Sequence, residues 1–369
     1  MPLMAIKTKC CVLSVAFSKD SGKIVSGSEA CRVQVWDAST GTELQHLNGH
    51  TEEVNSVVFS HNGKSVVSGS DDKSVRVWDV STGVELHQLN GHTDRVKSVA
   101  FSHDSTHIVS GSCDKSVRVW SASTGAQKQQ LNGHTDWVRS VAFSHDSTYI
   151  VSGSDDKSVR VWNALTGAVL HQLNGHTNWI RSVAFSHDST HIVSGSCDKS
   201  VQVWNASTGA ELQQLNGHTD FVNSVAFSYN STYIVSGSDD KSVRVWDAST
   251  GAQLQRLTGH VGFIKSVAFS YDGIYIASGS EDGSMWVWDA STGAGLQPLN
   301  GHTSWIRSVA FSHNSTQIVS GADDKSVRVW NSSTGAELQH LNGHTDEVHS
   351  VAFSHDSSCI VSGSDDKSV

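Results

Sequence analysis

The sequence has little proline, little charge and no basic excess. Only Pro2 and Pro298 occur among 369 residues, and charged residues make up 17% of the chain. The formal net charge is −10, whereas proteins that bind nucleic acid usually carry clusters of lysine and arginine. We therefore expect no nucleic acid partner for this chain.

Long apolar segments are also absent. Residues 1–18 contain no run long enough for a signal peptide or a membrane span. Apolar runs elsewhere are short, so no membrane association is expected. The six cysteines show no disulfide pattern, and Cys113 and Cys197 occupy equivalent positions in a repeat. We interpret all six as reduced thiols of a cytoplasmic, intracellular protein.

The sequence is rich in copies of itself. The dipeptide Gly-His recurs every 42 residues, at 49–50, 91–92, 133–134, 175–176, 217–218, 259–260, 301–302 and 343–344. Tryptophan recurs with the same period, at 36, 78, 120, 162, 204, 246, 288 and 330. One unit therefore accounts for nearly the whole chain.

Each unit contains four short, β-branched runs separated by turn residues. In the second unit these runs are 54–60, 64–70, 74–80 and 84–90, with the turn sequences SHNG, DDK and STG between them. No helical period is sustained, so each unit is predicted to be a four-stranded antiparallel meander. Such sheets bury both faces by stacking, and a closed ring removes the end faces. The predicted fold is an all-β propeller.

A unit with Gly-His near one end and Trp-Asp near the other resembles the WD40 repeat. Trp-Asp stands at Trp36, Trp78, Trp246 and Trp288, while Ser follows Trp120 and Asn follows Trp162, Trp204 and Trp330. The resemblance implies a WD40 β-propeller that binds a protein or peptide. Near-identical copies also resemble the WD40 arrays attached to fungal NACHT-type (STAND) NTPases, which act in non-self recognition.

The resemblance further implies one buried hydrogen-bond network per blade, formed by the His of Gly-His, a Ser, an Asp and the Trp. In the second, fourth and sixth blades its members are His50, Ser68, Asp72 and Trp78; His134, Ser152, Asp156 and Trp162; and His218, Ser236, Asp240 and Trp246. A Ser-His-Asp set that recurs in seven units is not a catalytic triad, which occurs once. No cysteine or histidine cluster has zinc spacing. We expect no catalytic residue, no enzyme activity, no metal and no cofactor.

Three positions change between units although the rest is copied. The first series is Glu53, Arg95, Trp137, Trp179, Phe221, Phe263, Trp305 and Glu347; the second, two residues on, is Asn55, Lys97, Arg139, Arg181, Asn223, Lys265, Arg307 and His349. The third precedes the network Asp and reads Asp71, Cys113, Asp155, Cys197, Asp239, Glu281, Asp323 and Asp365. In WD40 propellers these positions open on one rim around the central channel.

The varied positions are interpreted as a recognition rim, because core positions repeat when the core repeats. The candidate partner-binding residues are Trp137, Trp179, Phe221, Phe263, Trp305, Arg95, Arg139, Arg181, Lys265 and Arg307. Tryptophan and arginine are frequent at binding hot spots, and exposed apolar patches mark interfaces. The alternative is that the aromatic side chains fill gaps between blades.

The whole chain, 1–369, is predicted to be one propeller domain. Eight complete units span about 12–344, and 345–369 is a partial ninth. Residues 1–11 fall in register with a fourth strand, which favours nine blades with a composite closing blade. Eight or seven blades with an overhang are the alternatives. The sequence stops inside a third strand, as expected for a fragment of a longer array.

The predicted function is a non-catalytic interaction scaffold, or the sensor module of a non-self recognition protein. Two alternatives stay open. One is a generic WD40 adaptor, such as a ubiquitin-ligase or signalling scaffold. The other is a carbohydrate-binding propeller, whose aromatic side chains would stack on sugar rings.

Overall fold

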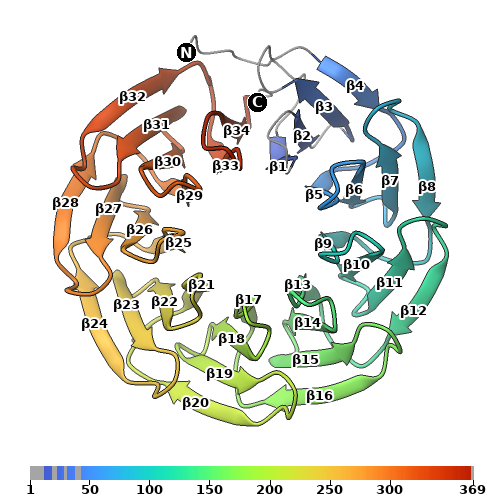
Figure 1. The fold of residues 1–369 in the computed structure, drawn as a ribbon, viewed down its shortest axis with the longest axis horizontal. Helices are drawn as coiled ribbons and strands as arrows, with labels where there is room; N and C mark the ends of the chain where they lie inside the picture. The colour runs from blue at the N-terminus through green and yellow to red at the C-terminus, as the bar shows by residue number, and fades with distance from the viewer. Residues whose placement is uncertain (1–11, 19–22, 29–30, 38–42, 367–369) are drawn as a thin grey trace.

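The β-branched runs form antiparallel hairpins that assemble into blades around a central opening (Figure 1). In this computed structural model, residues 12–18, 23–28, 31–37 and 43–366 are described. The described strands form eight four-stranded sheets and one two-stranded sheet. Within these residues, no helix has the length and apolar character needed to cross a membrane.

Every four-stranded sheet follows chain order from the innermost to the outermost strand. Blade one comprises β1 (Val12–Phe17), β2 (Lys23–Ser28), β3 (Val33–Asp37) and β4 (Glu43–Leu47); blade two β5 (Val54–Phe59), β6 (Ser65–Ser70), β7 (Val75–Asp79) and β8 (Glu85–Leu89); blade three β9 (Val96–Phe101), β10 (His107–Ser112), β11 (Val117–Ser121) and β12 (Gln127–Leu131); blade four β13 (Val138–Phe143), β14 (Tyr149–Ser154), β15 (Ser158–Asn163) and β16 (Val169–Asn174).

The second half of the ring repeats this plan. Blade five comprises β17 (Ile180–Phe185), β18 (His191–Ser196), β19 (Val201–Asn205) and β20 (Glu211–Leu215); blade six β21 (Val222–Phe227), β22 (Tyr233–Ser238), β23 (Ser242–Asp247) and β24 (Gln253–Thr258); blade seven β25 (Ile264–Phe269), β26 (Tyr275–Ser280), β27 (Ser284–Asp289) and β28 (Gly295–Asn300); blade eight β29 (Ile306–Phe311), β30 (Gln317–Ala322), β31 (Ser326–Asn331) and β32 (Glu337–Asn342); blade nine β33 (Val348–Phe353) and β34 (Ile360–Ser364).

The ring closes through the two-stranded sheet. Strand β33 contacts β29 on one side and β1 on the other, and β34 also contacts β1. The all-β propeller of four-stranded antiparallel blades predicted from the sequence is therefore confirmed, with eight full blades and a ninth position between the last and the first (Figure 1). The predicted closing strand, 1–11, lies outside the described residues.

The core lies between neighbouring blades. One cluster joins β2, β3 and β4 of blade one to β5, β6 and β7 of blade two, with Val25, Val35, Leu47, Val57 and Trp78 all buried. A Cβ on Gly69 would lie 2.7 Å from Cγ1 of both Val96 and Val99 in the next blade. The Ser-Gly-Ser of the second strand thus has glycine where two sheets approach most closely.

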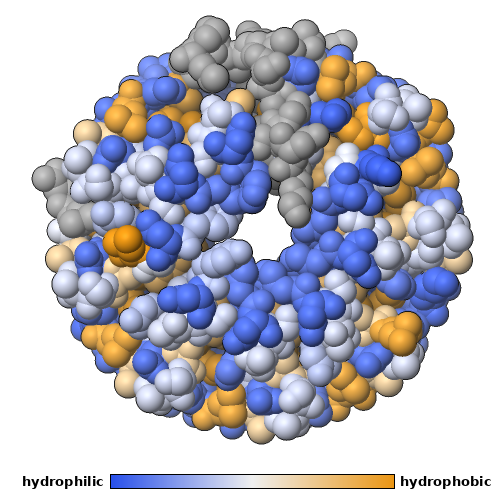
Figure 2. All heavy atoms as spheres, in the orientation of Figure 1, coloured by the Kyte–Doolittle hydropathy of each residue, from blue (hydrophilic) through white to orange (hydrophobic). Residues whose placement is uncertain are grey.

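Hydrogen bonds also cross from blade to blade at both ends of the core. At the channel wall, Ser14 Oγ accepts from the backbone N–H of Val57 at 3.2 Å. At the perimeter, Gln45 Nε2 donates to the carbonyl of Ser81 at 2.9 Å, and equivalent bonds recur along the ring. Figure 2 shows that hydrophilic residues border the central opening, while hydrophobic residues gather towards the perimeter.

The hairpin turns between the first and second strands of successive blades carry rings that contact one another, mostly in tilted pairs. We call this set the ring stack; it comprises His61, His103, His145, His187, Tyr229, Tyr271, His313 and His355. Six of its seven centroid distances are 4.1–4.5 Å, and the Tyr229–Tyr271 pair is at 6.1 Å. The stack therefore adds aromatic contacts between blades.

Candidate functional site

The varied rim positions lie where the first strand of each blade begins, at a β-bulge. In blade four, Val138 pairs with Ser154 and Ser140 with Gly153, so Arg139 has no ladder partner. The same register shift recurs at Arg181, Lys265 and Arg307. A bulge re-aims its extra residue out of the sheet, and bulges are common beside functional sites. The sequence pattern alone gave no signal of this bulge.

Backbone hydrogen bonds hold the two loops of the rim together. The N–H of Asp155 donates to the carbonyl of Trp137 at 2.9 Å. Ser154 Oγ also donates to the carbonyl of Asp136 at 3.0 Å. Blade five has the same contact, from the N–H of Cys197 to the carbonyl of Trp179 at 2.9 Å. Each rim aromatic is thus presented by a backbone that is fixed on both sides.

We call the five aromatic positions and the cations beside them the aromatic rim. The exposed fractions are 40% for Trp137, 46% for Trp179, 38% for Phe263 and 41% for Trp305, while Phe221 is half-buried. In the described part of the chain, the rings of neighbouring rim aromatics do not stack on one another. Each ring therefore keeps part of its surface in solvent, at a separate place on the rim.

Rim cations lie over these rings. The distance from the charged group to the ring centroid is 4.8 Å for Arg139 over Trp137, 5.4 Å for Lys265 over Phe263 and 5.3 Å for Arg307 over Trp305. Arg181 differs, since it lies 6.0 Å from the ring of Phe221 in the next blade. These distances are typical of cation–π contacts, so the rim aromatics pack chiefly against their own cations.

The third varied position supplies the counter-ions. Arg139 binds Asp155 with three hydrogen bonds of 2.7–3.1 Å, and this pairing raises the pKa of Arg139. Arg307 binds Asp323 at 2.6 and 2.8 Å and Glu347 at 2.9 Å. The acidic residues of the third varied position are thus in direct contact with these two rim arginines.

Rim charges are also paired between blades, across the seam of blades two and three and the seam of blades six and seven. Lys97 reaches back to Asp71 at 2.9 Å, and Arg95, which is exposed, lies 3.5 Å from the same carboxylate. Lys265 binds Glu281 of its own blade at 2.8 Å and approaches Asp239 of blade six at 3.6 Å. Rim charges are therefore shared between blades, which the sequence could not show.

The network side chains form an ordered chain in each of blades two to eight. In blade two, Trp78 Nε1 donates to Ser68 Oγ at 2.9 Å, His50 Nε2 lies 2.7 Å from that hydroxyl, and His50 Nδ1 lies 2.8 Å from Asp72 Oδ2. Ser74 adds two hydrogen bonds to Asp72, at 2.6 and 2.8 Å. Sequence reasoning missed this second serine, although it recurs in blades two to eight as the Ser of Asp-Asp-Lys-Ser or its equivalent, the first unit having Arg32 there.

Burial sets the protonation of this network. Desolvation lowers the pKa of His50, so the imidazole is neutral near pH 7, donates from Nδ1 and accepts at Nε2. Burial acts to raise the pKa of Asp72, but hydrogen bonds from His50 and Ser74 hold it well below its usual range. The donors and acceptors of this Trp-Ser-His-Asp network are then satisfied, as expected for a structural network.

Two other features of the described residues have the outward form of a binding site. Ligand atoms of Glu347, His349 and Asp365 lie within 4.8 Å of one another. However, His349 Nε2 lies 2.7 Å from Asp365 and Arg307 lies 2.9 Å from Glu347, so ion pairs account for this cluster. We assign no metal to it.

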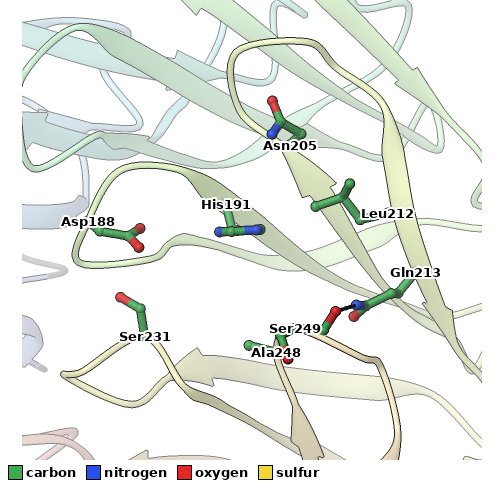
Figure 3. A pocket seen from close by; sticks show the side chains of 8 residues that line it. All are labelled: Asp188, His191, Asn205, Leu212, Gln213, Ser231, Ala248 and Ser249. Carbon is green, nitrogen blue, oxygen red and sulfur yellow. Dashed lines mark hydrogen bonds between the residues drawn. The ribbon is translucent and has the colours of Figure 1, made fainter.

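The other is a depression of about 390 Å³ between blades five and six, which has Leu212 on its wall (Figure 3). Its contact from Gln213 Nε2 to the carbonyl of Ser249, at 2.6 Å, is the perimeter bond that recurs around the ring. We therefore interpret this depression as part of the seam between blades.

Comparison with known protein families and solved structures agrees with this geometry. The family model for the WD domain, G-beta repeat, matches at nine places, residues 3–37, 41–79, 83–121, 125–163, 167–205, 209–247, 251–289, 294–331 and 335–369. The chain belongs to the WD40 repeat family. WD40 propellers are generally non-catalytic scaffolds that bind proteins or peptides, so membership indicates a protein-interaction scaffold.

One solved structure similar to this chain is the crystal structure of the computationally designed Ika8 protein. It has 36% sequence identity and a TM-score of 0.75, over 88% of this chain and 97% of the designed chain. A search of curated proteins found no match. The family therefore fixes the fold and the general class of function, and the partner must be argued from the rim.

Proposed function

We propose that this propeller is a non-catalytic interaction domain that binds a protein or peptide on the aromatic rim. One observation carries the proposal: the scaffold positions are copied from blade to blade, whereas the exposed rim positions differ. A packed interior would not accept Glu, Arg, Phe and Trp at one site. A surface that contacts a partner does accept such variation.

The contacts of the rim support a binding role. Trp137, Trp179 and Trp305 are each at least 40% exposed on a backbone held by hydrogen bonds, so little conformational entropy is lost when a partner docks. The cation beside each ring is already positioned by its carboxylate or by a neighbouring ring. Preorganised tryptophan and arginine are the residues that dominate binding energy at protein interfaces.

A narrower proposal concerns biological context. Near-identical units with a variable rim would allow one scaffold to acquire new specificities, which suits the recognition module of a non-self recognition protein. This context is supported by the resemblance to NACHT-associated arrays and by the pattern of variation. It would be tested by reading the full-length gene for a neighbouring NTPase segment.

The test of the general proposal is a paired capture from a lysate of the source cell. One bait is the wild-type chain, and the other carries W137A, W179A and W305A after circular dichroism has established its folding. A protein captured by the wild type and lost from the variant is then purified and titrated directly. Tyr229→Ala, which removes an exposed aromatic from the opposite face, is the matched control and should keep the partner.

Two results would contradict the proposal. Equal direct affinity of the partner for wild type and triple variant would place binding elsewhere. Binding to a glycan array that is lost in the triple variant, without any protein partner, would favour the carbohydrate-binding alternative.

A further inference from the structure

Blade five is the exception in the charge pattern of the rim. Where blade four has Arg139 bound to Asp155, blade five has Arg181 beside Cys197, with Arg181 Nε 3.0 Å from the sulfur. Cys197 is buried, at 3% exposure. No ion pair joins Arg181 to any carboxylate among the described residues.

A second acid is missing from the same place. The residue before the rim aromatic is Asp136 in blade four but Asn178 in blade five. Its side chain plays the same local role in both, because the backbone N–H of Trp137 and that of Trp179 each bind it at 2.8 Å. The turn geometry is therefore kept while both negative charges are removed.

The other blade with cysteine at this repeat position does not share this property. Blade three has Cys113 at the equivalent position, but its Lys97 reaches Asp71 of blade two at 2.9 Å. Arg181 makes no ion pair with the corresponding carboxylate, Asp155, which binds Arg139 through both oxygens. Arg181 is thus a rim arginine whose counter-ion is left for another molecule to supply.

The orientation of Arg181 suits this role. It lies 6.0 Å from the ring of Phe221 in blade six rather than over its own Trp179, and Trp179 is the most exposed of the rim aromatics, at 46%. Its side chain is exposed, and Nη1 and Nη2 make no hydrogen bond with a described residue. The two terminal donors of the guanidinium therefore lie near the Phe221 ring, on the same rim as the exposed Trp179.

We propose that Trp179, Arg181 and Phe221 form a subsite for a carboxylate side chain, Asp or Glu, of a peptide segment that also places an apolar residue against Trp179. The partner's carboxylate binds Arg181 in the way that Asp155 binds Arg139 in blade four. A guanidinium binds a carboxylate through parallel hydrogen bonds, which are stronger than bonds between neutral groups. This subsite rests on the proposed function, because it names the chemistry of a partner on the same rim.

Because the net charge of this protein is −10, we expect its partner to carry few acidic residues. A peptide with many carboxylates would be repelled by the remainder of the protein. We therefore infer one acidic residue next to one apolar residue, rather than an extended acidic tract.

The test uses two Gly-Ser peptides that differ in one residue, Leu-Glu in one and Leu-Gln in the other. Each is titrated into the intact chain while the indole N–H resonance of Trp179 is followed by NMR. Wild type should bind the Glu peptide about tenfold more tightly, since one charge-assisted hydrogen-bond pair is lost with Gln. Cys197→Asp should abolish this preference, because the new carboxylate would occupy Arg181.

Two further variants sharpen the result. Cys359→Asp makes the same change in net charge in the hairpin-turn region of blade nine and should keep the preference. Asp155→Cys removes the counter-ion of Arg139 and should add a second preference, seen at the indole of Trp137.

The outcomes separate this subsite from the general proposal. Equal binding of the two peptides to wild type, no shift with the Glu peptide, or a preference that survives in Cys197→Asp would overturn the subsite. If the partner found by capture still depends on the rim tryptophans in that case, the proposed function stands without the subsite. If that dependence also fails, both fall.

Discussion

The two faces of the ring use aromatic side chains in opposite ways. Each first strand begins at the aromatic rim and ends in the turn that carries the ring stack, so the two sets lie at opposite ends of the same strands. In the stack, His103 lies 4.3 Å from His61 and 4.5 Å from His145, in the blades on either side. On the rim, Trp137 contacts Arg139 of its own blade and keeps 40% of its surface exposed.

The difference shows which positions are constrained by the fold. In blades two to nine this position always carries a ring, with tyrosine in place of histidine at Tyr229 and Tyr271, whereas the first unit has Lys19. The first rim position is Glu, Arg, Phe or Trp in different blades, and its contacts differ with it, as in the pair of Glu347 and Arg307. Variation within one chain therefore separates contacts that repeat around the propeller from positions whose contacts differ between blades.

The largest loss of stability is expected from breaking the buried hydrogen-bond network of one blade. Trp246→Ala removes a side chain that is 1% exposed and the donor to Ser236 Oγ at 2.9 Å. We expect a loss of about 3–5 kcal/mol in the free energy of unfolding, as for other buried aromatic truncations. Urea denaturation followed by circular dichroism measures it, and an unchanged midpoint would show that the network does not stabilise blade six.

A smaller effect is expected from a pair that changes together in blade seven. Arg76 and Arg328 donate to Glu85 and Glu337 at 2.5 and 2.7 Å, but blade seven has Trp286 and Gly295 in these positions. The indole of Trp286 stacks on Trp288, with ring centroids 4.8 Å apart. A Cβ on Gly295 would lie 3.0 Å from the ring of Trp286.

Gly295→Gln should therefore overpack this site and cost about 1–3 kcal/mol. Adding Trp286→Arg should recover most of the loss, because it recreates the pair of blade six, in which Arg244 Nη1 donates to Gln253 Oε1. The double-mutant cycle is measured by urea unfolding. Strict additivity of the two changes would show that the pair is not coupled.

The ring stack should make stability depend on pH. Burial, and then the nearby His61, His145 and His187, lower the pKa of His103 to about 4 from an ordinary value of 6.5. The unfolded chain therefore binds a proton that the folded chain does not, and stability falls as pH drops from 6.5 towards about 4. Buried network histidines such as His134, whose pKa burial also lowers, act in the same direction.

His103→Tyr isolates the contribution of the stack, because tyrosine occupies this place in blades six and seven. The variant should lose less stability than wild type when unfolding midpoints near pH 7 and pH 4.5 are compared. Parallel pH profiles of the two chains would mean that the stack does not sense protons.

The smallest effect on stability is expected on the rim. Trp137→Ala leaves the bulge and its backbone hydrogen bonds in place, so we expect a loss of only about 1 kcal/mol from the buried part of the ring. The thermal midpoint measures it. A loss as large as that of Trp246→Ala would make Trp137 a core residue and would support the gap-filling alternative.

The fold was predictable because it is local and repeated. The 42-residue period, the β-branched runs and the turn residues each specify a four-stranded blade, and eight copies repeat the same information. The members of the network could also be placed, because the resemblance assigns His50, Ser68, Asp72 and Trp78 to fixed positions in the unit. Ser74 was overlooked since it looks like an ordinary turn residue.

The sequence by itself thus determined the blades, the ring and the choice of varied positions on the rim. Only the tertiary structure decided which of those positions touch. The bulge at Arg139, its pairing with Asp155, the reach of Lys97 to Asp71 and the isolation of Arg181 beside Cys197 all depend on distances between loops and between blades. Those distances are set by how twisted sheets pack around the channel, which a one-dimensional period does not contain.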